Sequence, residues 1–580
     1  MRENKLIKPV FYIIFLVMDK KHLLIAILII SAALRLISLS SGDTVNDEVF
    51  MSFRGLGMMD FNEASAQTTP LEWWDGNIPW WTHLSFHDHP PLVFAVQNIF
   101  MKIFGENNFA FRLPSALLGI ASVYLIYLIG IILYSENTGL IAATLLGITL
   151  SNVYISRVGM QESYVIFFML LASYLFLKSL KNEKYLIWTG AVLGLAFLTK
   201  YTAFVLVPIF FTYLLFFKRA RPELAERNYF LNKKFWLAIA LSVIIFSPVI
   251  IYNVMLYRAA GHFDFQFSYI FGQNPEIWKV TPGKDIGTLK DRLLVFIPRL
   301  ISTNSWVFLS LFGLSLLSFI FSLAKNIKEI LKRHSFIIIV FIFLTALLLK
   351  IGPSYRFLTM LTPFFALSIA ILLNYIRQNY SNVLKNIRIE KIAIYGIGLA
   401  ILSFEIFYSV NNQIADYPIG PTPWLSSKVR FENYNWGYNE LGDFFEKELS
   451  GKIPALTFNP KYKFLDDLRN SAIEEGVKKG YPSYPALIVL VGNFDKGAKL
   501  WTLDRLHIYH GWPIISIETY FQFLKENGFD YYERMGFKNY YFVVSANSVL
   551  TPDENKLLEN KNIIPIYNKR NDEAFKIYTF

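Results

Sequence analysis

Residues 41–92, SGDTVNDEVFMSFRGLGMMDFNEASAQTTPLEWWDGNIPWWTHLSFHDHPPL, form a long polar stretch in a chain otherwise dominated by apolar runs. This stretch directly follows the first long apolar run, and it is crowded with acidic, histidine and tryptophan residues. The chain after it is a series of hydrophobic segments. We therefore expect residues 41–92 to form most of an active site at a membrane surface, held in place by the apolar segments.

The composition is that of a membrane protein. Of the 580 residues, 54% are hydrophobic and 17% are charged, whereas soluble domains carry about 25% charged residues. Apolar runs of about 20 residues recur along the chain, as membrane-spanning helices require. The absence of cysteine excludes disulfides and thiolate metal sites. The net charge of +12 indicates basic cytoplasmic loops rather than nucleic-acid binding.

The apolar runs predict eleven spans. They lie at about 22–40, 112–134, 139–156, 163–180, 185–199, 201–217, 235–257, 301–324, 335–350, 355–376 and 391–410. With this count, every cluster of Lys and Arg falls on the side of the N-terminus, which is the cytoplasm by the positive-inside rule. The clusters are the N-terminus, 178–184, 218–234, 325–333 and 377–391. The apolar segment 9–18 is short and lacks a cleavage site, so it predicts an interfacial segment rather than a signal peptide.

We therefore expect a polytopic α-helical membrane domain, 1–410, followed by an extracytoplasmic α/β domain, 411–580. The first external loop would be 41–104, because 89–104 is short and begins with two prolines, which favours a helix in the outer leaflet over a twelfth span. A second long external loop would be 257–299. In the C-terminal domain, apolar runs predict strands at 485–492 and 540–544 with a helix at 519–527 between them.

Asp47 and Glu48 are adjacent carboxylates just beyond the first span. A carboxylate near an apolar boundary holds its proton more tightly, which suits it to accept a proton from an attacking hydroxyl. The alternative is a structural role at the N-terminus of a short helix over 49–59, where negative charge is favourable. The two roles are compatible, and we retain both residues as catalytic candidates.

Three of the eight histidines fall near the end of the same stretch, at His83 and in the segment His87-Asp88-His89-Pro90-Pro91. Alternate residues of an extended segment point the same way, so His87 and His89, with Asp88, could hold one divalent metal ion. A hydrogen-bonded loop fixed by two prolines explains the pattern equally well. The four tryptophans of the stretch fit either stacking on sugar rings or a position at the membrane interface.

Four further ionisable residues lie at the expected outer ends of spans: Arg157, Glu162, Lys200 and Arg356. Arg157 and Glu162 could neutralise each other, and Lys200 and Arg356 could simply extend to lipid head groups. The alternative is that the cations bind the phosphate of a lipid-linked substrate, for which Lys and Arg are the natural donors.

Several fragments, in this order, resemble one family, the membrane glycosyltransferases of the GT-C fold, in the branch of protein O-mannosyltransferases and lipid A aminoarabinose transferases. The resemblance covers about the first 220 residues, with a looser match at 355–367. The fragments are DE at 47–48, HPPL at 89–92, FGENNFAFRLPSALLG at 104–119, SRVGMQES at 156–163, GLAFLTKYT at 194–202 and YRFLTMLTPFFAL at 355–367.

The resemblance implies transfer of a monosaccharide from a polyprenyl-phosphate donor to an acceptor hydroxyl outside the cytoplasm. The family's proposed general base maps to Asp47, and a second acidic residue maps to Glu162, where many relatives have Asp. HPPLVF departs from the HPPLGK form of the protein mannosyltransferases at Val93 and Phe94, so glycan, lipid and protein acceptors all stay open. Asp47 would take the proton of the acceptor, the anomeric configuration would invert, and Lys200, Arg356 and Arg157 would bind the phosphate.

A polytopic transporter or lipid flippase is the alternative class. Transporters show internal repeats and broken helices at the membrane centre, whereas the ionisable residues here lie at the ends of spans and no repeat is visible. A sensor with an external ligand-binding domain is a weaker alternative, because no expected cytoplasmic segment is large enough to signal.

Overall fold

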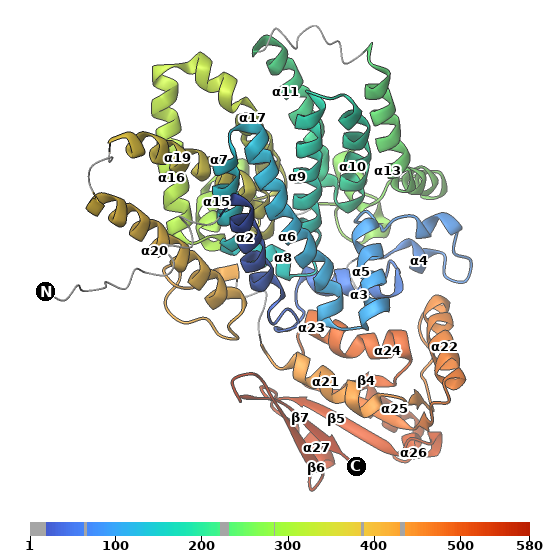
Figure 1. Ribbon diagram of the computed structural model, residues 1–580. Helices are drawn as coiled ribbons and strands as arrows, with labels where there is room; N and C mark the ends of the chain where they lie inside the picture. The colour runs from blue at the N-terminus through green and yellow to red at the C-terminus, as the bar shows by residue number, and fades with distance from the viewer. Residues whose placement is uncertain (1–18, 63–66, 221–230, 284, 384–387, 430–434) are drawn as a thin grey trace, which may run out of the picture. The chain divides into compact units, whose positions relative to one another are not determined.

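The computed structural model describes residues 19–62, 67–220, 231–283, 285–383, 388–429 and 435–580 (Figure 1). The chain divides into two compact units. The helical unit comprises Met1–Leu39, Asp88–Gln266 and Gly283–Arg430, and the mixed unit comprises Ser40–His87, Phe267–Pro282 and Phe431–Phe580. This division differs from the domain boundary expected at 410, which stays a prediction. The apolar segment expected at 9–18 lies outside the described residues.

The helical unit is made of long apolar helices joined by short connections (Figure 1). Its helices are α2 (Lys20–Leu36), α5 (Leu92–Phe104), α6 (Asn108–Leu133), α7 (Glu136–Ile148), α8 (Leu150–Arg157), α9 (Gln161–Ser179), α10 (Lys184–Thr199), α11 (Leu206–Ala220), α13 (Lys233–Ala260), α15 (Leu289–Thr303), α16 (Trp306–Lys325), α17 (Ile327–Ile351), α18 (Tyr355–Leu358), α19 (Thr362–Val383) and α20 (Arg388–Gln413). The helix α14 (Phe265–Ile270) follows α13, and single 3₁₀ turns, η2 (Tyr201–Val205) and η5 (Thr359–Leu361), precede α11 and α19.

Helices occupy all eleven segments predicted to span the membrane, which confirms the polytopic helical class. Within the described residues, six helices are long and apolar enough to cross a membrane, or seven if the bent pair α7 and α8 is one span. The other predicted spans coincide with shorter helices or with a helix only partly described, so the number eleven is not reproduced by length and composition. At 301–324 the predicted span is broken, because α15 ends at Thr303 and α16 begins at Trp306.

Small residues allow the apolar helices to approach closely. A Cβ at Gly190 of α10 would lie 2.1 Å from the carbonyl oxygen of Ala238 in α13, and one at Gly130 of α6 would lie 2.6 Å from the Cα of Gly139 in α7. Close backbone contact of this kind is how helices associate where apolar burial gives no preference for a partner over lipid. The glycines therefore fix the α6–α7 and α10–α13 pairs, and α9 packs between α6 and α10.

The predicted span 139–156 is bent by 58° between α7 and α8. The bend lies at Thr149, whose backbone is extended between the two helices. The helix α8 that follows the bend ends at Arg157.

The mixed unit combines a sheet with short helices. Before the C-terminal segment it contains α3 (Asp47–Gly57), α4 (Pro70–Trp73) and two 3₁₀ turns, η1 (Trp80–His83) and η4 (Glu276–Trp278). The C-terminal elements are α21 (Tyr438–Leu449), β1 (Ile453–Pro454), α22 (Lys463–Lys478), β2 (Ser483–Tyr484), β3 (Ala486–Val491), α23 (Lys496–Lys499), the π-helical turn η7 (Leu500–Asp504), α24 (Arg505–His510), β4 (Ile514–Ser516), α25 (Ile517–Asn527), α26 (Tyr531–Met535), β5 (Asn539–Ser545), α27 (Pro552–Leu558), β6 (Asn562–Tyr567) and β7 (Glu573–Thr579). The strands predicted at 485–492 and 540–544 and the helix predicted at 519–527 are thus confirmed.

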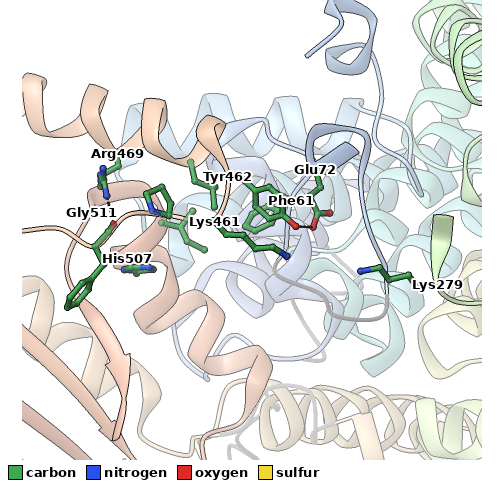
Figure 2. Close-up of a pocket in the computed structure, with 12 residues that line it drawn as sticks. Phe61, Glu72, Lys279, Lys461, Tyr462, Arg469, His507 and Gly511 are labelled. Atoms are coloured by element: carbon green, nitrogen blue, oxygen red, sulfur yellow. Dashed lines mark hydrogen bonds between the residues drawn. The ribbon is translucent and has the colours of Figure 1, made fainter. Parts of the chain in front are cut away.

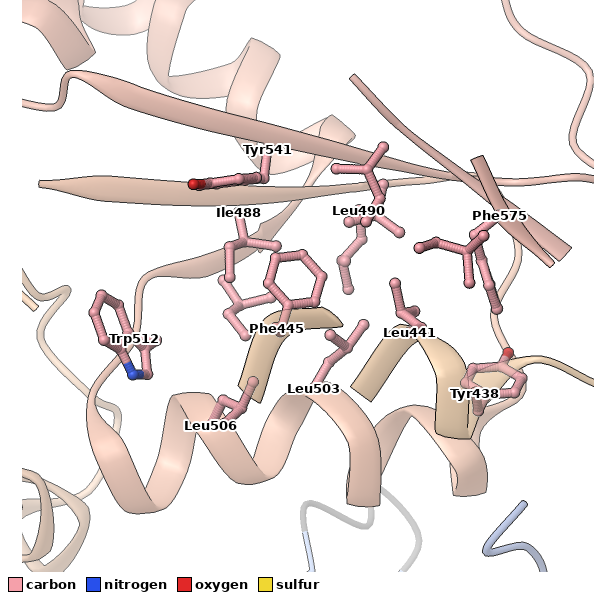
Figure 3. Packing of buried hydrophobic residues seen from close by; sticks show 14 of the residues in the cluster. Tyr438, Leu441, Phe445, Ile488, Leu490, Leu503, Leu506, Trp512, Tyr541 and Phe575 are labelled. Atoms are coloured by element: carbon pink, nitrogen blue, oxygen red, sulfur yellow. The ribbon is translucent and has the colours of Figure 1, made fainter. Parts of the chain in front are cut away.

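The main sheet has the strand order β4-β3-β5-β7-β6, parallel from β4 to β5 and antiparallel from β5 to β6. All six residues of β3 are buried, as expected of a continuous apolar run with both faces covered. Ala486, Ile488 and Leu490 pack on one face with α21, η7 and α24, as Figure 3 shows in part. The alternate residues of β3 pack on the other face with α25 and α26.

Residues 41–87 of the polar stretch are part of the mixed unit. Val45 is 2% exposed and belongs to the apolar core between the sheet and α21. The Phe53 and Tyr509 rings meet edge to face at 5.1 Å, and the Tyr509 hydroxyl donates to the Phe53 carbonyl at 2.7 Å. Residues 40–87 therefore fold together with the C-terminal α/β segment.

Candidate active site

The helical unit contains a buried carboxylate between two cations. Glu162 Oε1 lies 2.6 Å from Lys200 Nζ and 3.5 Å from Arg356 Nε. The Glu162 side chain is 2% exposed, whereas those of Lys200 and Arg356 are 12% and 16% exposed. Glu162 is thus sealed behind the two cations, and the cations retain a limited accessible surface. The trio carries a formal charge of +1.

Helix ends position all three side chains. Glu162 is in the first turn of α9, where the helix dipole favours negative charge, and Lys200 is the C-cap of α10, where it favours positive charge. Arg356 is in the single turn α18, which begins at the N-cap Ser354. Glu162 and Lys200 are therefore placed where their own helices stabilise their charges.

Phe357 forms an aromatic surface beneath both cations. Lys200 Nζ lies 4.5 Å from the Phe357 ring centroid, and the Arg356 guanidinium carbon lies 5.0 Å from the same point. Cation–π contacts hold the two side chains without using their hydrogen-bond donors. Such a pair of cations with accessible donors is suited to bind a phosphate group.

Arg157 is engaged in a different way from Lys200 and Arg356. Its Nη1 donates to the carbonyls of Leu34 at 3.0 Å and Ile37 at 2.8 Å, and its Nη2 donates to the Ser38 carbonyl at 2.8 Å. These carbonyls lie at and just beyond the end of α2, where helical carbonyls lack intrahelical partners. Arg157 therefore closes the C-terminus of the first predicted span, and Glu162 pairs with Lys200 and Arg356 rather than with Arg157. Phosphate binding by Arg157 stays a prediction.

A second polar network in the helical unit was missed by the sequence analysis. The Tyr201 hydroxyl donates to Asp264 Oδ2 at 2.8 Å, and Asn253 Nδ2 donates to the same oxygen at 3.0 Å. The Asp264 backbone N–H returns a bond to Asn253 Oδ1 at 2.9 Å. Tyr201 directly follows Lys200, so the network fixes the chain at the residue after the cation. No spacing in the sequence connects Tyr201 with Asp264.

Asp47 and Glu48 lie in the first turn of α3 in the mixed unit, as the structural alternative predicted. The helix begins two residues before the predicted Val49 and ends at Gly57. Glu48 is fully buried and Asp47 is partly exposed. Of the two carboxylates, Asp47 is thus the one with access to solvent and to a substrate.

Asp43 anchors the start of this segment. Its carboxylate accepts from the backbone N–H groups of Trp436 and, at 2.9 Å, Asn439. Burial raises the pKa of the Asp43 carboxyl to about 6, although these backbone donors oppose the shift. Asp43 and Val45 thus fix the backbone that leads into Asp47.

His87 is buried in the mixed unit and is paired with a residue that the sequence analysis missed. His87 Nδ1 lies 2.8 Å from Asp60 Oδ1, and the His87 backbone N–H donates to Asp60 Oδ2 at 2.7 Å. The His87 ring stacks on Trp278 at 5.5 Å, and its Nε2 lies 3.3 Å from Gln67 Oε1. A carboxylate on Nδ1 orients Nε2 as a metal ligand in many metal sites. Asp60 follows two methionines with no spacing signal that could have identified it.

The residues after His87 begin the helical unit. His89 Nδ1 lies 3.0 Å from Asp88 Oδ1, and the His89 ring meets Phe94 edge to face. His83 is exposed at the end of η1. The structure thus gives His87 a carboxylate from Asp60 and gives His89 one from its neighbour Asp88.

A bundle of apolar helices that carries buried charges at helix ends is typical of a polytopic membrane protein. Residues 88–252 match the family model described as "Dolichyl-phosphate-mannose-protein mannosyltransferase". The chain is 29% identical over 214 residues to "Putative mannosyltransferase YkcB" of Bacillus subtilis (strain 168), a match that covers 34% of this chain and 27% of that protein.

Two solved structures share the fold over most of the chain. ArnT from Cupriavidus metallidurans bound to undecaprenyl phosphate aligns with a TM-score of 0.52 and 12% identity, covering 96% of this chain and 97% of that one. The apo oligosaccharyltransferase of Archaeoglobus fulgidus aligns with a TM-score of 0.51 and 14% identity, covering 91% of this chain and 69% of that one. The resemblance to GT-C membrane glycosyltransferases is thereby confirmed.

Proposed function

We propose that this protein transfers a monosaccharide from a polyprenyl-phosphate donor to an acceptor hydroxyl at the outer face of the membrane, with inversion of the anomeric configuration. The observation that carries the proposal is the Glu162–Lys200–Arg356 cluster. It offers two partly accessible cations over an aromatic ring, at the ends of apolar helices. A lipid-linked phosphate needs cationic donors beside an apolar surface.

The cluster would act on the leaving group. As the bond between the anomeric carbon and the phosphate oxygen breaks, its electron pair passes to that oxygen, and Lys200 and Arg356 stabilise the added negative charge. Glu162 holds Lys200 Nζ at 2.6 Å, so the ammonium group is already oriented before the donor binds. Preorganised charge of this kind avoids reorganisation during the reaction.

Asp47 would act on the acceptor. Its carboxylate takes the proton of the acceptor hydroxyl while the hydroxyl oxygen forms the new bond to the anomeric carbon. Attack opposite to the departing phosphate inverts the configuration. Glu48, which is buried beside Asp47 in α3, has no accessible surface for an acceptor and would support the position of the base. A general base contributes about 10²- to 10⁴-fold to such a reaction.

The proposal takes further support from the similar proteins. The matching family model and YkcB are both named for mannosyl transfer, and ArnT was solved with undecaprenyl phosphate. These names favour a polyprenyl-phosphate sugar as the donor. The clusters of Lys and Arg would place the N-terminus in the cytoplasm and the mixed unit outside.

A divalent metal ion is proposed as an additional component near His87. Asp60 and His87 provide a carboxylate and an imidazole, which are ligands that first-row divalent metals accept, and Asp88 and His89 follow directly in the chain. A bound cation would add positive charge for a phosphate. The residues of the chain would in any case orient His87 through Asp60 and Trp278.

The test uses purified protein and radiolabelled polyprenyl-phosphate sugars in detergent. We expect release of free polyprenyl phosphate that depends on an acceptor, and Asp47→Asn should reduce the rate about 100-fold or more. Asp530→Asn makes the same chemical change at an exposed carboxylate (62% exposed) and should leave the rate unchanged. Full activity of Asp47→Asn would refute the assignment of the base, and movement of intact donor without cleavage across the bilayer of vesicles that contain the same protein would identify a flippase.

A further inference from the structure

The mixed unit contains a pocket of about 320 Å³ that the proposed reaction does not use. Its lining comes from three separate parts of the chain, as Figure 2 shows. These are the loop 40–87, the segment 267–282 and the C-terminal α/β segment. The volume is within the range of small-ligand sites. We call it the Tyr462 pocket, lined by Phe61, Glu72, Lys279, Phe458, Pro460, Lys461, Tyr462, Leu465, Arg469, His507, Ile508 and Gly511.

The charge of the Tyr462 pocket is positive. Lys279, Lys461 and Arg469 contribute three cations, and Glu72 is the single carboxylate among the lining residues. In Figure 2 the side chains of Lys461 and Lys279 extend toward one another from opposite sides. Neither lysine forms an ion pair with a carboxylate among the described residues, although Glu72 acts on Lys461 electrostatically. An anion in the pocket would therefore meet two ammonium groups that form no ion pair within the part of the chain that the structure describes.

The only carboxylate among the described residues that line the pocket, that of Glu72, already accepts hydrogen bonds from other groups of the mixed unit. Glu72 Oε2 accepts from the Thr69 backbone N–H at 2.6 Å in the capping box of α4, and its Oε1 accepts from the Tyr462 hydroxyl at 3.0 Å. Glu72 thus fixes the orientation of the Tyr462 ring. Its negative charge is used at a helix N-terminus, where it is most stabilising, and offers little to a ligand cation.

Aromatic rings form another wall. The Phe61 and Tyr462 rings meet edge to face at 6.0 Å, and Phe464 stacks on Tyr462 at 5.5 Å. Phe458 contributes a further ring to the lining. Rigid aromatic faces with a polar tip suit ligands that combine apolar C–H surface with hydroxyl groups, and a sugar ring is such a ligand.

Arg469 and His507 give the pocket hydrogen-bonding groups whose orientation is fixed by other contacts. Arg469 is 9% exposed, and its guanidinium is held by the Phe458 carbonyl and by Asp466, while its Nε–H has no acceptor. Gly511, at φ +76°, leaves room for this side chain, because a Cβ there would lie 2.5 Å from Arg469 Cγ. His507 Nδ1 lies 2.8 Å from the Trp512 carbonyl, so Nδ1 carries the hydrogen and Nε2 can accept from a hydroxyl.

We propose that the Tyr462 pocket binds an anionic saccharide, a sugar ring that carries a phosphate or a carboxylate. Tyr462 and Phe61 would contact the ring, His507 its hydroxyls, and Lys279 and Lys461 the anionic group. The extension that this saccharide is part of the acceptor rests on the proposed function. The binding itself does not, because none of these residues belongs to the Glu162–Lys200–Arg356 cluster.

The test is direct binding to the purified full-length protein by calorimetry, without donor. The probes are glucosamine 6-phosphate acylated on nitrogen, glucuronic acid, neutral N-acetylglucosamine and inorganic phosphate. We expect one or both anionic sugars to bind at least about tenfold more tightly than the neutral sugar and than inorganic phosphate. Which of the two binds more tightly distinguishes a phosphate from a carboxylate as the natural anion.

Two double variants complete the test. Lys279→Gln with Lys461→Gln should weaken binding of the anionic sugar about tenfold or more, and neutral-sugar binding should not change. Lys525→Gln with Lys556→Gln removes two exposed lysines elsewhere in the mixed unit and should change neither. Equal binding of all four probes, or unchanged affinity in the first double variant, would overturn the proposal.

The binding assay also separates this inference from the proposed function. If the protein binds the anionic sugar but transfers no sugar, the binding site in the Tyr462 pocket is supported and the proposed transferase function is refuted. If the protein transfers sugar but binds none of the probes, the transferase function is supported and the binding site in the Tyr462 pocket is refuted.

Discussion

Replacement of Lys200 by Met tests whether this lysine serves the substrate or only neutralises Glu162. The change leaves Glu162, which is 2% exposed, with Arg356 as its remaining partner at 3.5 Å instead of Lys200 at 2.6 Å. Loss of one partner of a buried ion pair destabilises a protein by about 3–5 kcal/mol. Because Arg356 remains, we expect the lower end, about 3 kcal/mol.

The second mutation, Glu162→Gln, separates the two roles. Replacement of a whole buried pair by neutral groups of similar size is often close to neutral for stability, so Lys200→Met with Glu162→Gln should recover most of the lost thermal stability. The rate of transfer should not recover. Removal of one preorganised group that stabilises developing charge lowers kcat by about 100- to 1000-fold, and this loss should be common to the single and the double variant.

The assay measures the apparent unfolding midpoint and the release of polyprenyl phosphate on the same detergent-purified samples. Lys525→Gln, at an exposed lysine of the mixed unit, is the matched control and should resemble the wild type in both. If the double variant regains both stability and rate, then Lys200 acts only by compensating Glu162, and its role at the phosphate is wrong.

Three further predictions concern the mixed unit. The pKa of Asp43 is raised from 3.8 to about 6 in the folded protein, so the folded state holds this proton more tightly than the unfolded chain does. The contribution of Asp43 to the free energy of unfolding is therefore complete below about pH 4. It is lost as the pH rises through 6, a decline of about 3 kcal/mol. Unfolding midpoints from pH 4 to 7 should show a smaller decline in Asp43→Asn than in the wild type, and parallel curves would contradict the shift. Val45→Ala, at a core position 2% exposed, should destabilise the mixed unit by about 2 kcal/mol, whereas Val549→Ala, at a position 94% exposed, should have no effect; equal midpoints for the two would show that the loop does not share the core. Protein purified with added Mn²⁺ or Zn²⁺ should retain metal by elemental analysis and lose it in His87→Ala but not in the exposed control His83→Ala, and a metal-free wild type would exclude the proposed metal site.

Features that depend on neighbouring residues, such as a buried strand, an apolar helix or a charge at the end of an apolar run, were predictable from the sequence. The run PALIVLVG predicted a buried strand, because six consecutive apolar residues with β-branched members fit a strand that is covered on both faces. The apolar runs in the same way predicted helices in eleven places. Lys200, Arg356 and Glu162 were recognised because ionisable groups at the ends of apolar runs are unfavourable unless they pair or function.

What the sequence could not decide is which distant groups meet. Glu162 and Arg356 are separated by most of the helical unit, and nothing in their spacing shows that one carboxylate receives both Lys200 and Arg356. Asp60 has no local signal at all, and it became visible only through its contact with His87.

The polar stretch 41–92 shows the same division most clearly. The sequence alone determined that it is an unusual, charge-rich segment, and it offered as one alternative that Asp47 and Glu48 lie at the N-terminus of a short helix. Only the tertiary structure decided that Val45 belongs to the core of the C-terminal sheet and that Asp43 binds backbone N–H groups of residues 436 and 439. The physical reason is that apolar burial and hydrogen bonding act through space, so a segment's partners depend on the folded chain and not on its neighbours in sequence.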